Sequence, residues 1–240
     1  MARFGSREVA DVTFYNQGNE PVLFLDTLKL TNMENDAERT YITGGRGNPR
    51  LLAFDYNRTA SFEIQDALMN PKSLALQSGV ELETNAQTIH MREVLTRTGT
   101  SVTLSKTPNS DVRLYSTTDG FNFDASTGEV ITLPASTAVT TGLTTSKVIA
   151  YYTYEKAVGI EKFTIRSDKF SDFYKVVGDT TITNYETKQE EAWQIVIPQA
   201  KINSAFEITM EAEGDASVFN MTLDIFKPEY GTEMIHFIKH

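Results

Sequence analysis

Residues 44–50 carry the side chains and the backbone freedom that could bind a phosphate group. The segment reads Gly-Gly-Arg-Gly-Asn-Pro-Arg, so backbone amides and the guanidinium groups of Arg46 and Arg50 could surround an anion. The Lys-Ser/Thr pair that completes a P-loop is missing, and residues 51–54 are typical of a strand rather than a helix. The other interpretation is a flexible loop whose two arginines pair with acidic groups of a neighbour.

Three histidines, His90, His236 and His240, are candidates for metal binding or proton transfer. None has the His-x-x-x-His or His-Glu-x-x-His spacing of a helical metal site. His90 and His236 could meet in space, but the sequence shows no activating neighbour for either. Since the chain also has no cysteine, we predict no catalytic residue, no metal site and no cofactor.

The 32 acidic residues invite comparison with glycosidases, in which two carboxyl groups at a suitable separation perform the reaction. With so many acids, some pair lies close together in any fold, so this pattern has little specificity. The acids that follow an alternating pattern are better explained as the solvent-facing positions of strands: Glu63, Glu207, Glu211, Glu213 and Asp224. An acid-dependent hydrolase stays as an alternative, whereas the Gly-x-Ser-x-Gly signature of esterases is absent.

A tyrosine-rich run at residues 151–154 could bind a sugar, because aromatic rings offer apolar faces with a polar edge. The same run, Tyr-Tyr-Thr-Tyr, also fits a strand that carries aromatic side chains on both faces. Core or interface packing and carbohydrate binding are therefore both open interpretations.

Alternation of apolar and polar residues predicts the strands that must position these groups. The pattern is clear at residues 60–65, 193–197, 206–213 and 219–225, and the last two flank a Gly214-Asp215 turn that predicts a hairpin. Further strands are expected at residues 9–15, 22–32, 88–97, 101–104, 112–115, 129–133, 148–155, 160–166, 180–186 and 233–238. This number of strands predicts a mainly β protein with a β-sandwich or barrel architecture.

One helix is predicted at residues 70–79. Asn70 is placed to cap it, Pro71 occupies the first helical position and Gly79 ends it. Its apolar contacts with the sheet should come from Leu68, Leu74 and Leu76. We expect the helix to cover an edge or a face of the sheet, which would block unwanted strand pairing.

The segment at residues 99–158 differs in composition from its flanks. It is dense in Thr and Ser, it holds many of the 31 threonines of the chain, and it has turn signals but no helical period. Because strands of the main pattern lie on both sides, we predict a small inserted β-module at residues 99–158. The β core would then consist of residues 1–98 and 159–240.

The overall composition argues against several classes of function. A net charge of −10 and a pI near 4.9 do not suit binding to the nucleic-acid backbone, which needs clustered Lys and Arg. No segment approaches the roughly 20 apolar residues of a membrane-spanning helix, and the N-terminal residues lack the apolar stretch of a signal peptide. We expect an acidic β protein that stays in the compartment where it is made.

Two stretches of the sequence resemble a known class of proteins. The first runs from Thr43 to Leu52 and, after a strand, continues from residue 66 as Asp-Ala-Leu-Met-Asn-Pro-Lys-Ser-Leu-Ala. The second reads Tyr-Lys-Val-Val-Gly-Asp-Thr from residue 174, then Trp-Gln-Ile-Val-Ile-Pro-Gln-Ala-Lys from residue 193, and closes with Glu-Ala-Glu-Gly-Asp from residue 211. Together they resemble virion tail proteins of tailed bacteriophages, most closely the major tail tube proteins.

This resemblance implies a tail-tube-like β-sandwich with one flanking helix, whose subunits stack as rings, hexameric in that family, around a DNA channel. Its partners would be further copies of itself, other tail proteins such as sheath, tape measure or baseplate, and genomic DNA that passes without specific binding. The protein would be made in the cytoplasm of the host bacterium and become part of the virion tail. Baseplate hub and distal tail proteins share the core fold and are the alternatives within this class.

The resemblance also suggests roles for individual residues. The loop that contains Arg46, Asn48 and Arg50 would reach an adjacent ring or subunit. Acids would line the channel, because like charge prevents DNA from sticking, and the candidates are Glu63, Glu207, Glu211 and Asp224. A competing interpretation from another class is a carbohydrate-binding or adhesin module, with residues 99–158 as its recognition surface.

Overall fold

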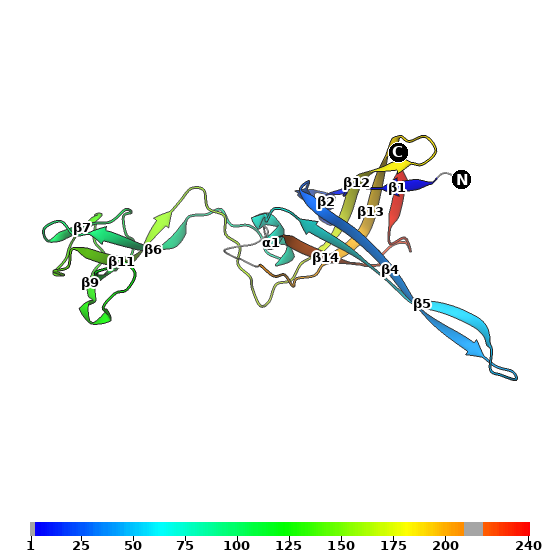
Figure 1. The fold of residues 1–240 in the computed structure, drawn as a ribbon, viewed down its shortest axis with the longest axis horizontal. Coiled ribbons are helices and arrows are strands. Elements are labelled where there is room, and N and C mark those ends of the chain that lie inside the picture. Colours follow the sequence, from blue (N-terminus) through cyan, green and yellow to red (C-terminus); the bar gives the residue numbers. More distant parts are fainter. Residues whose placement is uncertain (1–2, 209–217) are drawn as a thin grey trace. The chain divides into compact units, whose positions relative to one another are not determined.

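The computed structural model describes residues 3–208 and 218–240, which form a mainly β protein (Figure 1). The chain divides into two compact units. The main unit combines the residues up to Leu82 with those from Phe163 onward, and the inserted unit is Glu83–Lys162.

The inserted unit begins earlier in the sequence than the expected boundary at residue 99. The cause is strand β6 (Gln87–Thr96), which pairs along its whole length with β11 (Lys147–Lys156). Next to this pair, the ammonium group of Lys162 lies 3.0 Å from the carboxylate of Glu83, and the two residues form an isolated β-bridge. The hydrogen bonds of β6 therefore belong to the inserted unit, although its sequence pattern matches the flanking core.

A nine-stranded antiparallel sheet forms the main unit. Its strands are β1 (Phe4–Ser6), β2 (Asp11–Tyr15), β3 (Pro21–Leu25), β4 (Leu28–Thr43), β5 (Arg50–Asp66), β12 (Phe173–Asn184), β13 (Glu190–Ile202), β14 (Phe219–Ile225) and β15 (His236–Lys239). The strand order is β3-β2-β12-β13-β14-β5-β4, with β1 added to β12 and β15 added to β13. The edge of β13 is thus shared, because β14 pairs with its C-terminal end and β15 with its N-terminal half.

One face of this sheet carries the core of the main unit. In β5, Ala60, Phe62 and Ile64 are buried, while the residues between them are only half-buried, which confirms the alternation seen in the sequence. Met221 and Leu223 of β14 lie opposite Ile64 and Phe62 and are also buried. The other face of these strands carries polar side chains.

The predicted helix is confirmed as α1 (Pro71–Gln77). The Asn70 side chain accepts a hydrogen bond from the amide of Lys72 at 2.9 Å, as an N-cap should. Leu74 belongs to the core of the main unit, and the Gln77 amide donates to the carbonyls of Asn203 and Ala205 at 2.8 and 3.0 Å. Packing and hydrogen bonds together therefore join α1 to the segment that follows β13.

Gly79 ends the helix for a steric reason. Its φ is +67°, and a Cβ atom at this position would lie 2.0 Å from the carbonyl oxygen of Phe170. No residue with a side chain fits there without a backbone shift.

Two small sheets face each other across the core of the inserted unit. The four-stranded sheet has the order β6-β11-β8-β9, with β8 (Val112–Thr117) and β9 (Glu129–Ile131), and β7 (Ser101–Thr103) pairs with β10 (Ala138–Thr140). A single 3-10 turn, η1, spans Ala125–Thr127. The buried core consists of Val102, Leu104, Val112, Leu114, Val139, Val148, Ala150 and Tyr152.

Three strand predictions differ from the structure. The strand expected at residues 22–32 is interrupted, because β3 ends at Leu25 and β4 begins at Leu28. Residues 160–166 form no strand, and only Lys162 makes a bridge there, because the neighbouring segment at Glu83 offers a single partner residue. The expected hairpin of residues 206–213 with 219–225 is also wrong as far as it is described: residues 206–208 are not a strand, and 209–213 lie outside the described residues. Its second half is β14, which pairs with β5 and β13 instead.

Candidate functional site: the hairpin of β4 and β5

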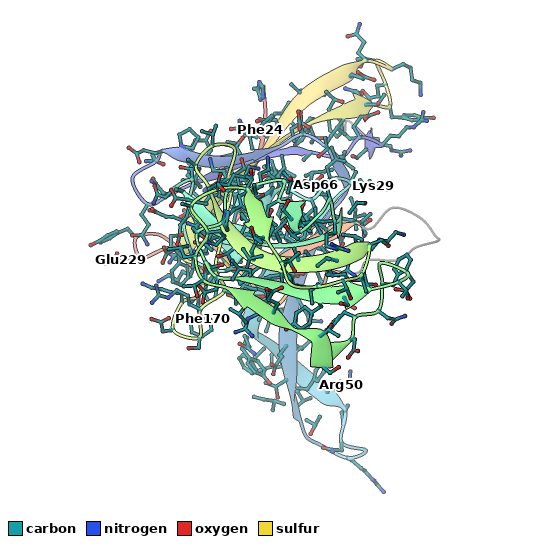
Figure 2. The ribbon with its side chains drawn as sticks, turned by 90° about the vertical axis from the view of Figure 1, so that its left-hand side faces the viewer. Phe24, Lys29, Arg50, Asp66, Phe170 and Glu229 are labelled. Atoms are coloured by element: carbon teal, nitrogen blue, oxygen red, sulfur yellow. The ribbon has the colours of Figure 1, made fainter. Side chains whose placement is uncertain are left out.

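The longest strands of the chain, β4 and β5, form a hairpin whose outer half has no cover on either face. In Figure 1 the hairpin leaves the sheet of the main unit as a two-stranded ribbon. From residue 34 to residue 59, Ala37 and Gly44 are half-buried and all other residues are exposed. Figure 2 labels Asp66 and Arg50, the two ends of β5, and their environments differ: Asp66 is buried, whereas Arg50 is exposed. A two-stranded ribbon of this kind is marginally stable in water by itself.

The register of the two strands places four exposed apolar side chains on one face. Ile42 lies opposite Leu52, Phe54 lies opposite Thr40, and Tyr56 lies opposite Glu38. Residues opposite each other share a face, as do residues two apart along a strand. Ile42, Leu52, Phe54 and Tyr56 therefore form one apolar stripe, with exposed fractions of 48%, 59%, 50% and 51%.

The opposite face of the ribbon carries an ion pair and a cation–π contact. The Arg39 guanidinium donates to the Asp55 carboxylate at 3.0 Å, and this pairing lowers the pKa of Asp55. The guanidinium carbon of Arg50 lies 3.9 Å from the centre of the Tyr41 ring, a cation–π contact. Ala53 lies opposite Tyr41 on this face, so the face combines charged and apolar side chains, whereas the other carries the continuous apolar stripe.

A β-bulge marks the point where the ribbon leaves the sheet. The register shifts between Asp36 and Glu38, and Asn57 on the other strand has a φ of 49°. The Asn57 amide donates to the Glu38 carboxylate at 2.7 Å and lowers the pKa of Glu38. A bulge bends and twists a strand pair locally, so this one sets the direction of the ribbon.

The tip of the ribbon is a turn closed by two backbone hydrogen bonds. The amide of Gly44 donates to the carbonyl of Pro49 at 3.1 Å, and the amide of Asn48 donates to the carbonyl of Gly45 at 3.0 Å. These two amides are therefore not available to cradle a phosphate group. Arg46 and Asn48 are exposed at the tip, whereas Arg50 is engaged with Tyr41.

Acidic residues gather at the base of the ribbon, on the same face as the apolar stripe. Glu34 and Asp224 both lie opposite Ser61, and Glu63 lies opposite Thr222 and Asn32. The structure thus brings together Glu63 and Asp224, which the sequence singled out, with Glu34 and Asp36, which it did not. Lys201 lies opposite Asp224 on β13 and supplies a positive charge beside this group.

Of the other two acids predicted for the channel, one lies elsewhere: Glu207 is exposed in the segment after β13, outside any strand. Glu211 lies outside the described residues. Among the residues that the structure describes, Glu63 and Asp224 are therefore the members of the expected group that come together.

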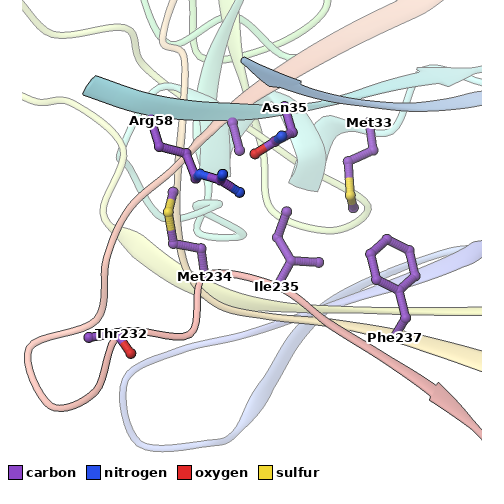
Figure 3. A pocket seen from close by; sticks show the side chains of 8 residues that line it. Met33, Asn35, Arg58, Thr232, Met234, Ile235 and Phe237 are labelled. Atoms are coloured by element: carbon purple, nitrogen blue, oxygen red, sulfur yellow. The ribbon is translucent and has the colours of Figure 1, made fainter. Parts of the chain in front are cut away.

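A pocket of about 520 Å³ lies where β5 and β15 diverge (Figure 3). Its walls come from the base of the hairpin and from the C-terminal segment, and most of them are apolar. The lining residues are Met33, Asn35, Arg58, Ala60, Thr232, Met234, Ile235 and Phe237. Arg58 extends over the pocket in Figure 3, and no carboxylate of the described residues lines it.

The histidines and the other ionisable groups form no reaction centre that the structure describes. His90 lies on β6 in the inserted unit and His236 on β15 in the main unit. Within residues 3–208 and 218–240, no three His, Asp or Glu side chains are arranged to hold a metal ion. No helix in the described part of the chain has the length and apolar character needed to cross a membrane.

Comparison with known proteins identifies a family for the chain. No curated protein sequence matches the chain. A family model described as the YomU/Tube protein family matches residues 4–237, which is nearly the whole chain, both units included. The chain therefore belongs to the YomU/Tube protein family, the phage tube-type structural proteins that the sequence resemblance indicated.

Proposed function

We propose that this protein is a tail tube subunit whose copies assemble into stacked, hexameric rings around a DNA-ejection channel. The observation that carries the proposal is the uncovered ribbon of β4 and β5, with its apolar stripe on one face. Contiguous exposed apolar surface of this kind marks a contact site. In a tube-type structural protein, the partner that is always present is another copy of the chain.

The charge along the ribbon supports a head-to-tail contact between copies. Its tip carries Arg46, its middle carries the apolar stripe, and its base carries Glu34 and Asp36. When the ribbon of one copy lies along the base of the next, its basic tip meets acids while its apolar stripe is covered. A contact between two different surfaces is heterologous, and such contacts generate rings or continuing stacks.

The pocket at the base of the ribbon offers a matching concave surface. Met33, Met234 and Phe237 give it apolar walls, and it lies on the face of the hairpin that turns away from the apolar stripe. We propose that an apolar side chain of a neighbouring copy enters it. The inter-subunit role of Arg46, Asn48 and Arg50 is part of the same proposal.

Glu63 and Asp224 are proposed to face the channel, together with Glu207 and Glu211. The support is the outward face of β5 and β14, where acids exceed bases locally. A channel wall of this sign would repel the DNA backbone and let it slide. The finished assembly would be part of the virion tail, in contact with sheath, tape measure or baseplate proteins.

The proposal is tested by a pair of substitutions on neighbouring residues of β5. Phe54→Lys places a charge in the apolar stripe, whereas Ala53→Lys places the same charge on the opposite face. Both positions are exposed, so neither change should lower the free energy of unfolding by more than about 0.5 kcal/mol. We expect Ala53→Lys to form tubes in negative-stain microscopy and Phe54→Lys to sediment as a monomer.

The same experiment separates the proposal from its alternatives. Tubes of uniform width and indefinite length support a tube subunit, whereas single closed rings indicate a baseplate hub or distal tail protein. Normal assembly of Phe54→Lys, or equal loss of assembly in both variants, would contradict the role of the apolar stripe.

A further inference from the structure

The outward face of the four-stranded sheet in the inserted unit carries two arginines that flank a tyrosine. Arg92 on β6 and Arg113 on β8 both lie directly opposite Tyr151 on the central strand β11. The next residues along these strands, among them Leu114 and Ala150, point the other way into the core. Neighbouring strands are about 4.8 Å apart, so the backbones that carry the two arginines are about 10 Å apart.

Aromatic rings surround this row of three residues. The ring of Tyr115 lies 4.7 Å from that of Phe123 and 6.0 Å from that of Tyr151, and Phe123 lies 5.9 Å from Tyr151, measured between ring centres. Phe123 is 44% exposed and Phe121, on the same loop, is 82% exposed. Large apolar side chains are thus presented to solvent beside two cationic groups.

The loop that presents the two phenylalanines is held rigidly. The Asp119 carboxylate accepts hydrogen bonds from the amides of Phe121 and Asn122 at 2.8 and 2.9 Å, and these bonds lower its pKa. The Thr117 hydroxyl donates to the carbonyl of Asn122 at 2.6 Å. Arg92 also holds the loop, through a bond to the carbonyl of Gly120 at 2.9 Å. A surface ordered before binding loses less entropy when a ligand arrives.

Neither arginine has a carboxylate partner among the described residues, although the chain has ten more acids than bases. The four ion pairs that the described residues form include neither of them. Arg92 donates only to the Tyr151 hydroxyl, at 3.2 Å, and to backbone carbonyls. The acid on this face of β11, Glu155, lies opposite Thr88 near the end of the strand. Two guanidinium groups are therefore placed to bind an acid from outside the chain.

We propose that Arg92, Arg113, Tyr151, Phe121 and Phe123 form a binding surface for an acidic saccharide. The aromatic rings would stack against the apolar faces of the sugar rings. The guanidinium of Arg113 would bind a carboxylate or phosphate substituent through paired hydrogen bonds. Arg92 would add a charge-assisted bond from Nη1, because its Nε and Nη2 groups already donate to Tyr151, Gly120 and Phe121. Nucleic acid fits this surface less well, because two arginines beside Glu155 do not make the cationic track that a phosphate backbone needs.

The test uses the full chain and isothermal titration calorimetry at low salt. The probes are a hexamer of galacturonic acid, which carries carboxylates, mannopentaose phosphate, which carries a phosphate, uncharged maltohexaose and a dT₁₂ oligonucleotide. We expect at least one acidic saccharide to bind, and to bind at least tenfold more tightly than maltohexaose. Salt at 0.5 M should weaken the binding, because it screens exposed charges.

Two variants and two matched controls locate the surface. Arg92→Gln combined with Arg113→Gln, and separately Phe121→Ala, should each weaken binding of the acidic saccharide at least tenfold. Arg166→Gln and Tyr230→Ala remove an exposed arginine and an exposed aromatic ring of the main unit and should leave it unchanged. The proposal is overturned if neither acidic saccharide binds, if the variants bind like the controls, or if dT₁₂ binds more tightly than both saccharides through the same residues. Phe121→Ala removes no internal hydrogen bond of the side chain, so a loss of binding in this variant does not reflect misfolding.

Discussion

The hydroxyl group of Tyr152 connects three segments of the inserted unit. It donates to the Glu93 carboxylate of β6 at 2.9 Å and accepts from the backbone amide of Lys106 at 3.2 Å. The Tyr152 side chain is 4% exposed. Removal of its hydroxyl group therefore leaves the Glu93 carboxylate and the Lys106 amide without this hydrogen bond, at a place that water reaches poorly. We expect Tyr152→Phe to lower the free energy of unfolding by about 1–3 kcal/mol, measured by urea denaturation at pH 8. Tyr230→Phe, at a position that is 87% exposed, is the matched control and should have no effect.

The same tyrosine predicts a loss of stability at high pH. Burial, and then the hydrogen bond to Glu93, raises the pKa of Tyr152 to about 12. An unfolded tyrosine has a pKa of about 10, so the folded state holds its proton more tightly. The resulting stabilisation is complete below about pH 10 and is lost as the pH rises toward 12. Burial likewise raises the pKa of Tyr174 in the main unit to about 12.

Urea denaturation at pH 8, 10 and 11 checks the direction of this effect. The free energy of unfolding should fall from pH 10 to pH 11 in the wild type and fall less in Tyr152→Phe, in which Tyr174 still titrates. An equal fall in both proteins would show that the Tyr152 hydroxyl does not contribute.

At the scale of elements, the β4–β5 ribbon is the part whose exposed sides need a partner. On the proposed contact, Arg46 and Arg50 at one end of the ribbon meet acids of the next copy. Replacement of both by Ala should abolish polymerisation and leave the folding of the monomer intact. Lys227→Ala, another exposed cation of the main unit, should assemble normally.

Sedimentation velocity and far-UV circular dichroism measure the two properties separately. Assembly of the wild type should also weaken between 0.05 and 0.5 M salt, because the screening length falls from about 14 Å to about 4 Å over this range. Tubes that form normally from Arg46→Ala, Arg50→Ala protein would rule out a role for the tip.

At the scale of the whole molecule, the proposed channel predicts whether assembled tubes bind DNA. Glu63→Lys combined with Asp224→Lys reverses two charges on the outward face of β5 and β14. Tubes of this variant should retain linear double-stranded DNA in a salt-sensitive way, because cationic groups bind phosphates with release of counterions. Wild-type tubes should retain none.

Glu229→Lys is the control for this prediction, since Glu229 is exposed and lies outside the strands of the sheet (Figure 2). DNA retention is measured by co-sedimentation of tubes with labelled DNA. Equal retention by the control, or none by the double variant, would mean that Glu63 and Asp224 do not face the channel.

Features that depend on neighbouring residues could be read from the sequence. Alternation at residues 60–65 revealed a buried and a polar face of β5, because side chains of a strand alternate whatever its partners are. Asn70, Pro71 and Gly79 marked the helix, since capping and termination are local effects. The β class also followed from these local patterns. The tube family was indicated by the resemblance of two stretches to tail tube proteins, and the family model confirms it.

The residues that matter most for the proposed functions come together through pairing between distant segments. Leu52 and Phe54 are apolar residues two apart, a spacing that places them on the same face of a strand. Their exposure, however, depends on how far the ribbon extends beyond the sheet. Arg92, Tyr151 and Arg113 are remote in sequence, and the register of three strands makes them neighbours. A shift of one residue in a strand pair would move every side chain to the other face. Such a register is set by the packing of the whole sheet, which is why the tertiary structure was needed to identify both surfaces.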